Sequence, residues 1–540
     1  MKRTFLALSV LLLSVSQSGY SAPSSTAGVG TFNLRLDDDP RTLNPVTYDD
    51  VYARKVLEWA FESLLQVDDN TYQYRPGLAE KYEISPDGMT FTFTLRKGLK
   101  WQDGQPLTAE DVKYSFDVLF EGRFFAPHRR IFYEPIKEAK VLSPEKIQFI
   151  AKEPYFLAFE QVATLFIIPK HFYGVGDPKD PKFNRTFLGS GPYQLEEWNK
   201  GQRLVLKRWA DYQPPNSEYD RSRNRFARIQ FRPIREMAVC IEMLKKGDLD
   251  YLELRDPRDY LNIHEEEKPD SKFVTVKATN SQPSMNNYAF IDWNTKNPLF
   301  QDKRVRQALA HLINRDMMIE KFRFGMSEKA NGPYGLRSPY SSQKVKALGY
   351  DPKKAKKLFE QAGWKMSSQG LVKEIDGKVT PFEFTLIHTN PDFEKYITLF
   401  QEDYKKAGVK MNVRLLEWNT FMKLVDERKF DAIGMGWTFY SLNSDLYQYY
   451  HSKSILAKGH NFGSFSKPEV DTLIEQIRST MDEKKRWKLA HRLHEILADE
   501  QPYSYLFNPK YILYAANKRI KRPKDILKYG VGYQTWFVEQ

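Results

Sequence analysis

The chain has 540 residues, a formal net charge of +13 at pH 7, and 41% hydrophobic and 28% charged residues, which excludes a disordered tail and a polytopic membrane protein. This length predicts about three or four domains. The single cysteine excludes an intramolecular disulfide framework, a CxxC redox centre and a cysteine zinc site.

The N-terminus has the order of a secretory signal peptide. Two basic residues precede an apolar run at 5–15, and small residues follow it. Because this run is too short to span a bilayer, we predict that residues 1–21 are a signal peptide, cleaved near Ser21 and Ala22. A buried N-terminal helix is the alternative, but the next stretch is rich in Ser, Gly and Pro. No cysteine lies nearby for a lipid anchor, so we expect a soluble, exported protein of the bacterial periplasm.

The positive net charge makes nucleic acid a partner to consider. The basic residues are interleaved with 69 acids, and dense basic runs occur only at 353–357 and 517–528. We interpret both runs as solvated faces of a helix or tail, and export removes nucleic acid from the expected partners. Attraction to anionic lipid or to a membrane complex remains open.

Periodic patterns in the first half predict alternating strands and helices. A strand is expected at 31–36, and helical spacing of apolar residues predicts a helix at 51–65. Strands at 82–84 and 90–95 flank the turn sequence Ser-Pro-Asp-Gly, which predicts a hairpin whose second strand has a wet face of threonines. Thr108 and Asp111 have the spacing of a capping box that opens a helix through Phe116. Further strands at 194–198 and 203–208 and a helix at 236–246 follow.

The second half has the pattern of a parallel α/β sheet. A strand is expected at 288–293 and helices at 305–324 and 351–363. The order strand–helix–strand–helix–strand then recurs at 382–387, 394–407, 413–416, 420–427 and 430–435, which is typical of parallel sheets. A capping box with an early proline at 466–469 and a helix at 482–497 complete this half.

Motifs of known catalytic chemistry are not found. The sequence has no GxGxxG after a strand, no Walker A loop, no GxSxG and no HExxH. The nearest metal-like cluster is His491, His494 and Glu495, which we interpret as the polar face of an amphipathic helix, so neither metal nor cofactor is predicted. Cys240 is interpreted as a small core residue. A secreted hydrolase with a non-standard site is the alternative from another class, and we expect no enzyme.

Five segments together resemble one known family, the family 5 extracellular solute-binding proteins, which are the oligopeptide- and dipeptide-binding proteins of ABC importers. The segments occur in the family's order and cover most of the chain after the signal peptide. They are LAEKYEISPDGMTFTFTLRKGLKWQDGQPLTAEDVKYSF at 78–116, GSGPYQLEEW at 189–198, DKRVRQALAHLINRDMMIEKFRFGMS at 302–327, GYDPKKAKKLFEQAGW at 349–364, and the stretch 461–507.

The resemblance implies an α/β fold of the periplasmic binding protein type. Two α/β lobes would be joined by a hinge, with an extra domain in the N-terminal half, which makes three domains. The implied boundaries are 28–64, 188–278 and 500–540 for a discontinuous domain I, 65–187 for domain II, and 279–499 for domain III.

The resemblance also implies the function. Such a protein, expected to be a monomer, captures a peptide between its lobes and delivers it to the permease subunits of an ABC importer at the inner membrane. The same fold binding a metal chelate, haem or a glycan is the alternative. One departure concerns the peptide's α-ammonium, since peptide-binding members carry an acid in W-x-x-D. Here Gly436 and Trp437 precede Thr438, Phe439 and Tyr440, so the acid is displaced to Asp445 or missing.

Loops that follow strands at the carboxyl edge of an α/β sheet face the binding crevice, which gives the candidate contacts. Tyr and Trp suit such a place because they offer flat apolar area with a polar tip. The alternatives are that these aromatics pack the core and that Asp445 caps a helix at 446–450. The predicted substrate-binding residues are Tyr48, Asp49, His388, Asn390, Glu417, Trp418, Trp437, Tyr440 and Asp445.

Overall fold

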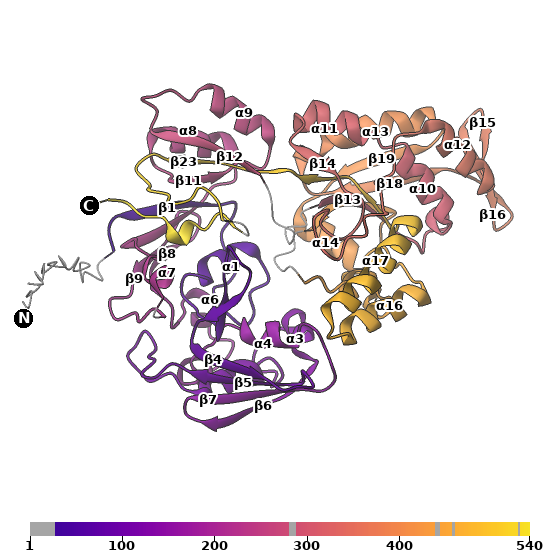
Figure 1. Cartoon of the computed structure of the whole chain (residues 1–540). Coiled ribbons are helices and arrows are strands. Elements are labelled where there is room, and N and C mark those ends of the chain that lie inside the picture. Colours follow the sequence, from indigo (N-terminus) through magenta and orange to yellow (C-terminus); the bar gives the residue numbers. More distant parts are fainter. Residues whose placement is uncertain are drawn as a thin grey trace, which may run out of the picture.

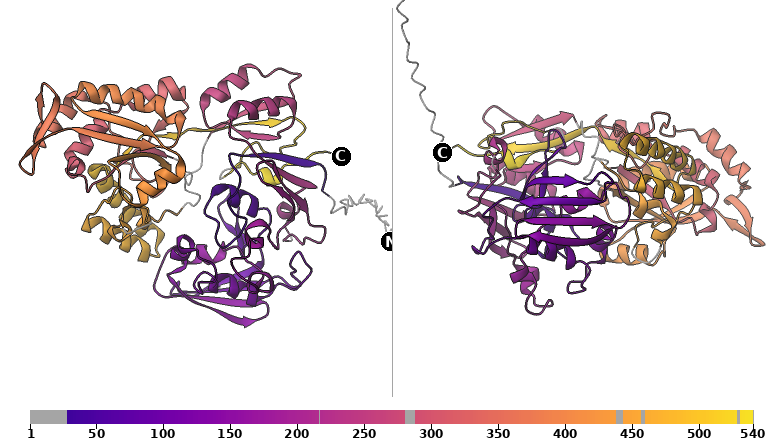
Figure 2. Two further views of the ribbon diagram at one scale, coloured as in Figure 1. Left: turned by 180° about the vertical axis from the view of Figure 1, so that it is seen from behind. Right: turned by 60° about the horizontal axis from the view of Figure 1, so that its bottom comes forward.

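The computed structural model describes residues 28–215, 217–279, 288–437, 443–455, 459–527 and 530–539, so the predicted signal peptide lies outside the described residues. The chain forms two lobes (Figure 1). The first lobe contains a seven-stranded and a four-stranded sheet, and the second lobe is built on a five-stranded sheet. The two lobes also lie side by side when the molecule is seen from behind (Figure 2, left).

The seven-stranded sheet collects strands from three distant parts of the chain. Its centre is the first strand, which runs parallel to β10 and β11, and the other pairs in the sheet are antiparallel. In spatial order the strands are β12 (Phe273–Thr279), β23 (Tyr511–Asn517), β11 (Tyr251–Glu253), β1 (Thr31–Leu36), β10 (Arg228–Pro233), β9 (Arg203–Arg208) and β8 (Tyr193–Asn199). The strands predicted at 31–36, 194–198 and 203–208 are confirmed.

The four-stranded sheet is an antiparallel unit within one continuous segment. Its order is β4 (Ala79–Ile84), β5 (Thr90–Leu95), β7 (Lys146–Ala151) and β6 (Ile136–Ser143), and a small sheet pairs β2 (Leu65–Val67) with β3 (Tyr74–Pro76). The predicted hairpin is confirmed, and its turn uses Gly88 at φ +69°. The prediction of a wet threonine face fails at Thr92, which is buried because its hydroxyl accepts a hydrogen bond from Gln148 of β7.

The helices of the first lobe are short and follow their predicted signals in part. The capping box of Thr108 and Asp111 is confirmed, and Gly247 ends the helix predicted at 236–246 in a left-handed conformation at φ +91°. The helices are α1 (Val51–Leu57), α2 (Ala109–Asp117), α3 (Pro127–Tyr133), α4 (Ala158–Ala163), α5 (Lys170–Tyr173), α6 (Lys182–Arg185), α7 (Glu218–Arg221), α8 (Met237–Lys246), α9 (Pro257–Glu265) and η4 (Tyr533–Thr535).

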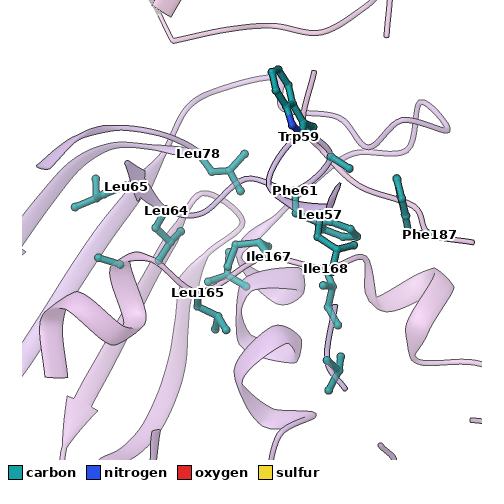
Figure 3. Close-up of a cluster of buried hydrophobic side chains, with 14 of the residues drawn as sticks. Leu57, Trp59, Phe61, Leu64, Leu65, Leu78, Leu165, Ile167, Ile168 and Phe187 are labelled. Atoms are coloured by element: carbon teal, nitrogen blue, oxygen red, sulfur yellow. The ribbon is translucent and has the colours of Figure 1, made fainter. Parts of the chain in front are cut away.

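The prediction of a helix at 51–65 is wrong beyond Leu57, because α1 ends there. The chain after it bonds to a distant segment, because the amide of Gly191 donates to Ala60 and that of Tyr193 donates to Trp59. Cβ atoms at Gly189 and Gly191 would collide with the backbone of Ala60, so only glycine permits this approach. The apolar residues of 57–65 are buried instead against the segment 165–168 (Figure 3).

The second lobe has the predicted parallel α/β core. In spatial order its sheet has β19 (Lys410–Leu415), β18 (Glu383–His388), β20 (Ala432–Trp437), β13 (Tyr288–Trp293) and β21 (Tyr503–Tyr505). β18 pairs in parallel with β19 and β20, which confirms the predicted order of 382–435. Smaller sheets pair β14 (Ser327–Lys329) with β22 (Phe507–Pro509), and β15 (Lys365–Ser367), β16 (Gly370–Ile375) and β17 (Lys378–Pro381) with one another.

The helices of this lobe also match most of the predicted ranges. They are η1 (Pro298–Phe300), α10 (Lys303–His311), α11 (Arg315–Arg323), α12 (Pro352–Gln361), η2 (Pro391–Phe393), α13 (Glu394–Lys406), α14 (Trp418–Asp426), α15 (Tyr447–Tyr450), η3 (Ser452–Ile455), α16 (Pro468–Ser479) and α17 (Glu483–Glu500). The capping box predicted at 466–469 does not form. Pro468 begins α16, so Lys467 rather than Ser466 occupies the cap position.

The chain passes between the lobes close to its C-terminal strand. β22 pairs with β14 in the second lobe, and β23 two residues later pairs with β11 and β12 in the first lobe. The predicted boundary at 499/500 therefore precedes β21 and β22, which belong to sheets of the second lobe. The domain boundaries themselves stay a prediction.

One buried carboxylate connects the central strand of the seven-stranded sheet with the segment that follows β23. Asp250, fully buried, accepts hydrogen bonds from the backbone and side chain of Asn33 in β1, and from Arg519 Nε at 2.8 Å. It therefore fixes the first strand and the segment after β23 to the same point. Removing this carboxylate would leave the backbone amide of Asn33 without its acceptor and Arg519, which is 40% exposed, without its counter-charge.

We expect Asp250→Asn to lower the free energy of unfolding of the first lobe by about 2–3 kcal/mol, because hydrogen bonds to a charged group are lost. Urea denaturation measures this. Asp525→Asn is the control, since Asp525 forms an exposed ion pair with Arg522 in the same C-terminal segment, and it should cost less than about 1 kcal/mol. Equal losses in the two variants would contradict the expectation.

Candidate functional site

A large cavity of about 2450 Å³ lies between the lobes in the part of the chain that the structure describes. The first lobe lines it with residues of 41–72, α3, 152–166, 212–215 and 220–224, and the second lobe with residues of α14, the end of β20, 443–449, 453–454 and 459–462. Sites for small molecules typically measure about 300–1,000 Å³. This cavity therefore has room for a ligand larger than a typical small molecule.

The lining mixes charges and aromatic rings. Twelve Asp or Glu and nine Lys or Arg line the cavity, although the whole chain has a formal charge of +13. Such a wall does not have the basic surplus that a polyanion requires. It suits a ligand that carries charges of both signs and some apolar surface.

The predicted residues of the first lobe lie at the cavity. Tyr48 lines it, with its ring 6.3 Å from that of Phe166 and 4.6 Å from the guanidinium carbon of Arg129. Asp49 also lines it and forms an exposed ion pair with Arg41 at 3.7 Å.

Three predicted residues of the second lobe lie there as well. Trp418, Trp437 and Asp445 line the cavity, whereas Tyr440 lies outside the described residues. The ring of Trp437 is 4.8 Å from that of Tyr449 and 5.8 Å from that of Phe462, so it belongs to an aromatic cluster. Contact of these residues with a ligand stays a prediction.

The other three predicted residues are absent from the described lining of the cavity. β18 continues one residue beyond the predicted strand, so His388 is fully buried within the sheet, with Nδ1 3.1 Å from the carbonyl oxygen of Asn390. The side chain of Asn390 accepts a bond from the amide of Asp392. Glu417 accepts one from the amide of Thr420 at the start of α14.

Asp445 makes a contact between the lobes that the sequence did not predict. Its Oδ2 accepts a hydrogen bond from the hydroxyl of Tyr155 in the first lobe at 2.9 Å, and Nε of Arg478 lies 3.1 Å from the same oxygen. Its Oδ1 accepts from the amide of Tyr447 at the start of α15, although Leu446 rather than Asp445 occupies the cap position of that helix. The carboxylate thus already has three partners.

The segment 155–160 extends this contact. Glu160 accepts a hydrogen bond from the side-chain amide of Asn443 at 3.1 Å, and the amide of Phe156 donates to the carbonyl of Arg478. The ring of Phe156 packs under Arg486, 4.6 Å from its guanidinium carbon. In the sequence this segment shows only the aromatic pair Tyr155 and Phe156, without helical or strand periodicity. Reasoning from periodicity therefore did not find the contact.

Glu62 is a buried acid in the wall of the cavity. Its carboxylate accepts a hydrogen bond from the hydroxyl of Tyr212 at 3.0 Å, and Arg96 lies 3.9 Å away. Burial outweighs these two favourable partners and raises the pKa of Glu62 to about 7. Its charge therefore changes near neutral pH.

The described residues show no arrangement typical of a metal site or of a membrane-spanning helix. Within the described ranges, no group of three His, Cys, Asp or Glu is placed to hold a metal ion. Nε2 of His491 lies 2.8 Å from the carbonyl oxygen of Pro339, and Nδ1 of His494 accepts from the amide of Ser342. Cys240 is buried in a hydrophobic cluster, which confirms that prediction. No helix among the described residues has the length and apolar character needed to cross a membrane.

Comparison with known proteins adds independent information. Residues 73–455 match the model described as bacterial extracellular solute-binding proteins, family 5 Middle. The chain is 28% identical to the oligopeptide-binding protein AppA of Bacillus subtilis over 98% of this chain and 96% of that protein. It is 25% identical to the dipeptide-binding protein of Escherichia coli over 83% of this chain and 84% of that protein.

Solved structures show the same fold. The structure of AppA from Bacillus subtilis with a nonapeptide has a TM-score of 0.80 and 25% identity, covering 95% of this chain and 100% of that one. The structure of NikZ from Campylobacter jejuni with Ni(L-His) has a TM-score of 0.78 and 24% identity, covering 94% and 99%. The fold expected from the sequence, two α/β lobes of the periplasmic binding protein type, is confirmed.

We expect Asp445→Ala to open the lobes of the ligand-free protein, because the Tyr155 hydroxyl and the Arg478 guanidinium both lose their acceptor. Small-angle X-ray scattering should give a larger radius of gyration than for the wild type. Glu469→Ala removes an exposed ion pair with Arg492 elsewhere on the same lobe and should leave the radius unchanged. Identical radii for all three proteins would show that Asp445 does not hold the lobes together.

The raised pKa of Glu62 makes the stability of the protein depend on pH. Folding raises the pKa of the Glu62 carboxyl from 4.5 to about 7. Between these two pH values the folded protein keeps a proton that the unfolded chain has lost, so the free energy of unfolding falls as the pH rises. Above pH 7 this loss amounts to about 3 kcal/mol. Glu62→Gln should therefore match the wild type in melting temperature at pH 4.5 and exceed it at pH 8. Glu58→Gln, at an exposed carboxylate on the same cavity wall, should show no such growth.

Proposed function

Because the chain belongs to the bacterial extracellular solute-binding proteins of family 5, we propose that it captures peptides between its two lobes and delivers them to an ABC importer. Residues 1–21 would direct export and be removed, which leaves a soluble monomer in the periplasm. The protein then presents the loaded ligand to permease subunits at the inner membrane. No covalent step is needed, since release requires only that the lobes separate.

The observation that carries this proposal is the size and lining of the cavity between the lobes. About 2450 Å³ exceeds the usual range for a small solute, and an extended peptide adds about 3.3–3.6 Å of length per residue. Charged groups of both signs suit the two ends of a peptide, and aromatic surfaces suit side chains of varied chemistry. The relative with 28% identity is named an oligopeptide-binding protein, which supports a peptide as the ligand.

The contact at Asp445 supports a ligand-dependent closure. Tyr155 and Asn443 contribute hydrogen bonds that form only when the lobes meet. A ligand that touches both walls adds to these bonds and shifts the lobes toward the closed state, as in hinge closure around a ligand. The affinity then includes the free energy of closing the lobes.

A non-peptide ligand is the second candidate, and one observation favours it. Solved structures on this fold hold Ni(L-His) in NikZ of Campylobacter jejuni and agropinic acid in AgaA of Agrobacterium tumefaciens R10, with TM-scores of 0.78 and 0.76. Because the fold alone accommodates such different ligands, the cavity of this chain decides between them. Its volume favours the peptide.

We expect the protein purified from osmotic-shock fluid to carry a mixture of peptides. Native mass spectrometry should show adducts that tandem fragmentation resolves into amino-acid ladders, and a synthetic copy of one such peptide should bind in calorimetry. The protein refolded from denaturant, which has lost its cargo, is the control. A single non-peptide mass in place of the ladders, or no binding of the synthetic peptide, would overturn the proposal.

A further inference from the structure

We propose that a second cavity, within the second lobe, binds a small organic molecule that carries two or more negative charges. This cavity measures about 610 Å³ in the part of the chain that the structure describes, which is a usual size for a small-molecule site. It shares no described lining residue with the cavity between the lobes. The proposal is therefore independent of peptide binding.

The second cavity lies on the face of the five-stranded sheet that α14 covers. Thr385 and Ile387 are alternate residues of β18 and share one face, and Arg414 of β19 pairs with Ile387 in the register of the sheet. Ile387 belongs to the same hydrophobic cluster as Phe421 of α14, which identifies the face. The remaining lining comes from Leu424 in α14, from the loop 428–431 after it and from residues of the loop 294–298 after β13.

The lining of the second cavity has a positive surplus that the larger cavity does not have. Four Lys or Arg and one Asp line it, against nine and twelve in the cavity between the lobes. The one carboxylate is that of Asp431, whose Oδ2 accepts from the amide of Thr385 at 2.9 Å and whose Oδ1 accepts from the side-chain amide of Asn297 at 2.8 Å. Since both oxygens are bonded to neutral donors, the surplus favours an anion as the occupant.

Two of the four cations lack a counter-charge within the described ranges. There, the ammonium of Lys296 and the guanidinium of Arg414 take part in no hydrogen bond or ion pair, whereas Lys429 pairs with Glu427 at 2.7 Å. Exposed cations without a partner are ordinary on a protein surface. These two are distinguished because they line the same concave site.

The backbone that carries these two cations is fixed by its own bonds. On either side of Lys296, the side-chain amides of Asn294 and Asn297 donate to the carbonyl oxygen of Phe430 and to Asp431, each at 2.8 Å. Arg414 lies in a strand that pairs with β18 along its length. Because neither segment has to rearrange, an anion that reaches both side chains loses little free energy to ordering of the backbone.

Arg428 adds positive charge to the lining. Its Nη2 donates to the carbonyl oxygen of Gly459 at 2.8 Å, and its Nη1 donates to that of Val425 at 2.7 Å. These bonds hold the guanidinium in the protein itself. Its contribution to an anion in the cavity is therefore electrostatic attraction, while Lys296 and Arg414 supply direct bonds.

The lining favours an organic anion over an inorganic ion. Apolar surface lies beside the cations, and burial of a carbon skeleton against it adds affinity. An arginine binds a carboxylate or a phosphate in a paired geometry, and a lysine binds either group as a point charge. The two classes that fit are therefore polycarboxylates and phosphomonoesters. The apolar lining residues are Pro298, Ile387, Leu424 and Phe430.

The test is calorimetry on the full-length mature protein at low and at physiological salt. The probes are citrate, phenyl phosphate and inorganic phosphate, with succinate and its neutral analogue succinamide as a matched pair. The variants are Lys296→Gln and Arg414→Gln, with circular dichroism to confirm folding. Lys410→Gln is the control, because Lys410 lies four residues before Arg414 in the same strand and pairs with Glu383 at 2.8 Å, outside the lining.

We expect citrate or phenyl phosphate to bind the wild type, and succinate to bind it more tightly than succinamide. Lys296→Gln and Arg414→Gln should each weaken binding about 5- to 10-fold. Lys410→Gln removes the same charge outside the cavity and should weaken binding less than about 2-fold. Tighter binding of citrate identifies a polycarboxylate as the ligand class, and tighter binding of phenyl phosphate identifies a phosphomonoester.

Four results would overturn the proposal. Equal weakening in Arg414→Gln and Lys410→Gln, or binding that disappears at physiological salt, shows an adventitious ion only. Inorganic phosphate that binds as tightly as citrate and phenyl phosphate overturns the organic class. No heat with any probe overturns the site, and this comparison on the wild type needs no variant. Peptide binding should be unchanged in all variants, since none of the substituted residues lines the cavity between the lobes.

Discussion

The carboxylate of Asp445 defines the closed arrangement of the two lobes. Tyr155 reaches it from one lobe, and Arg478 neutralises it from the other. Since the lobes share no sheet among the described residues, side-chain contacts of this kind fix the depth of the cavity. The position of each wall residue relative to the opposite wall follows from this contact together with the bonds of Glu160 to Asn443 and of Phe156 to Arg478. An acid that the sequence marks as a candidate for the ligand therefore also belongs to the protein's own closing contact.

Local patterns in the sequence predicted what is determined locally. The hairpin at Gly88, the capping box at Thr108 and the strand order of 382–435 all depend on neighbouring residues, and the structure has them. The helix after Val51 stopped early because bonds from Gly191 and Tyr193, far along the chain, replace its own. No window of the sequence around 51–65 contains that information.

In the candidate site, too, the residues that depend on local patterns were predicted and those that depend on distant partners were not. The rule that strand ends face the crevice placed Trp437 and Tyr48 at the cavity, but a strand longer by one residue moved His388 into the sheet. Tyr155 was missed because it lies in a short segment without periodicity and becomes notable only through a partner distant in sequence. Burial and pairing, rather than residue type, distinguish such a residue from its neighbours.

The order of strands in the seven-stranded sheet has a consequence for how the chain is made. β1 lies at the centre, whereas β23 lies between β11 and β12 and is the last strand of the sheet to be synthesised. The nascent polypeptide therefore carries an incomplete sheet until residue 517 has left the ribosome. Contacts that span most of the sequence form slowly. This topology therefore delays completion of the seven-stranded sheet until translation is nearly finished.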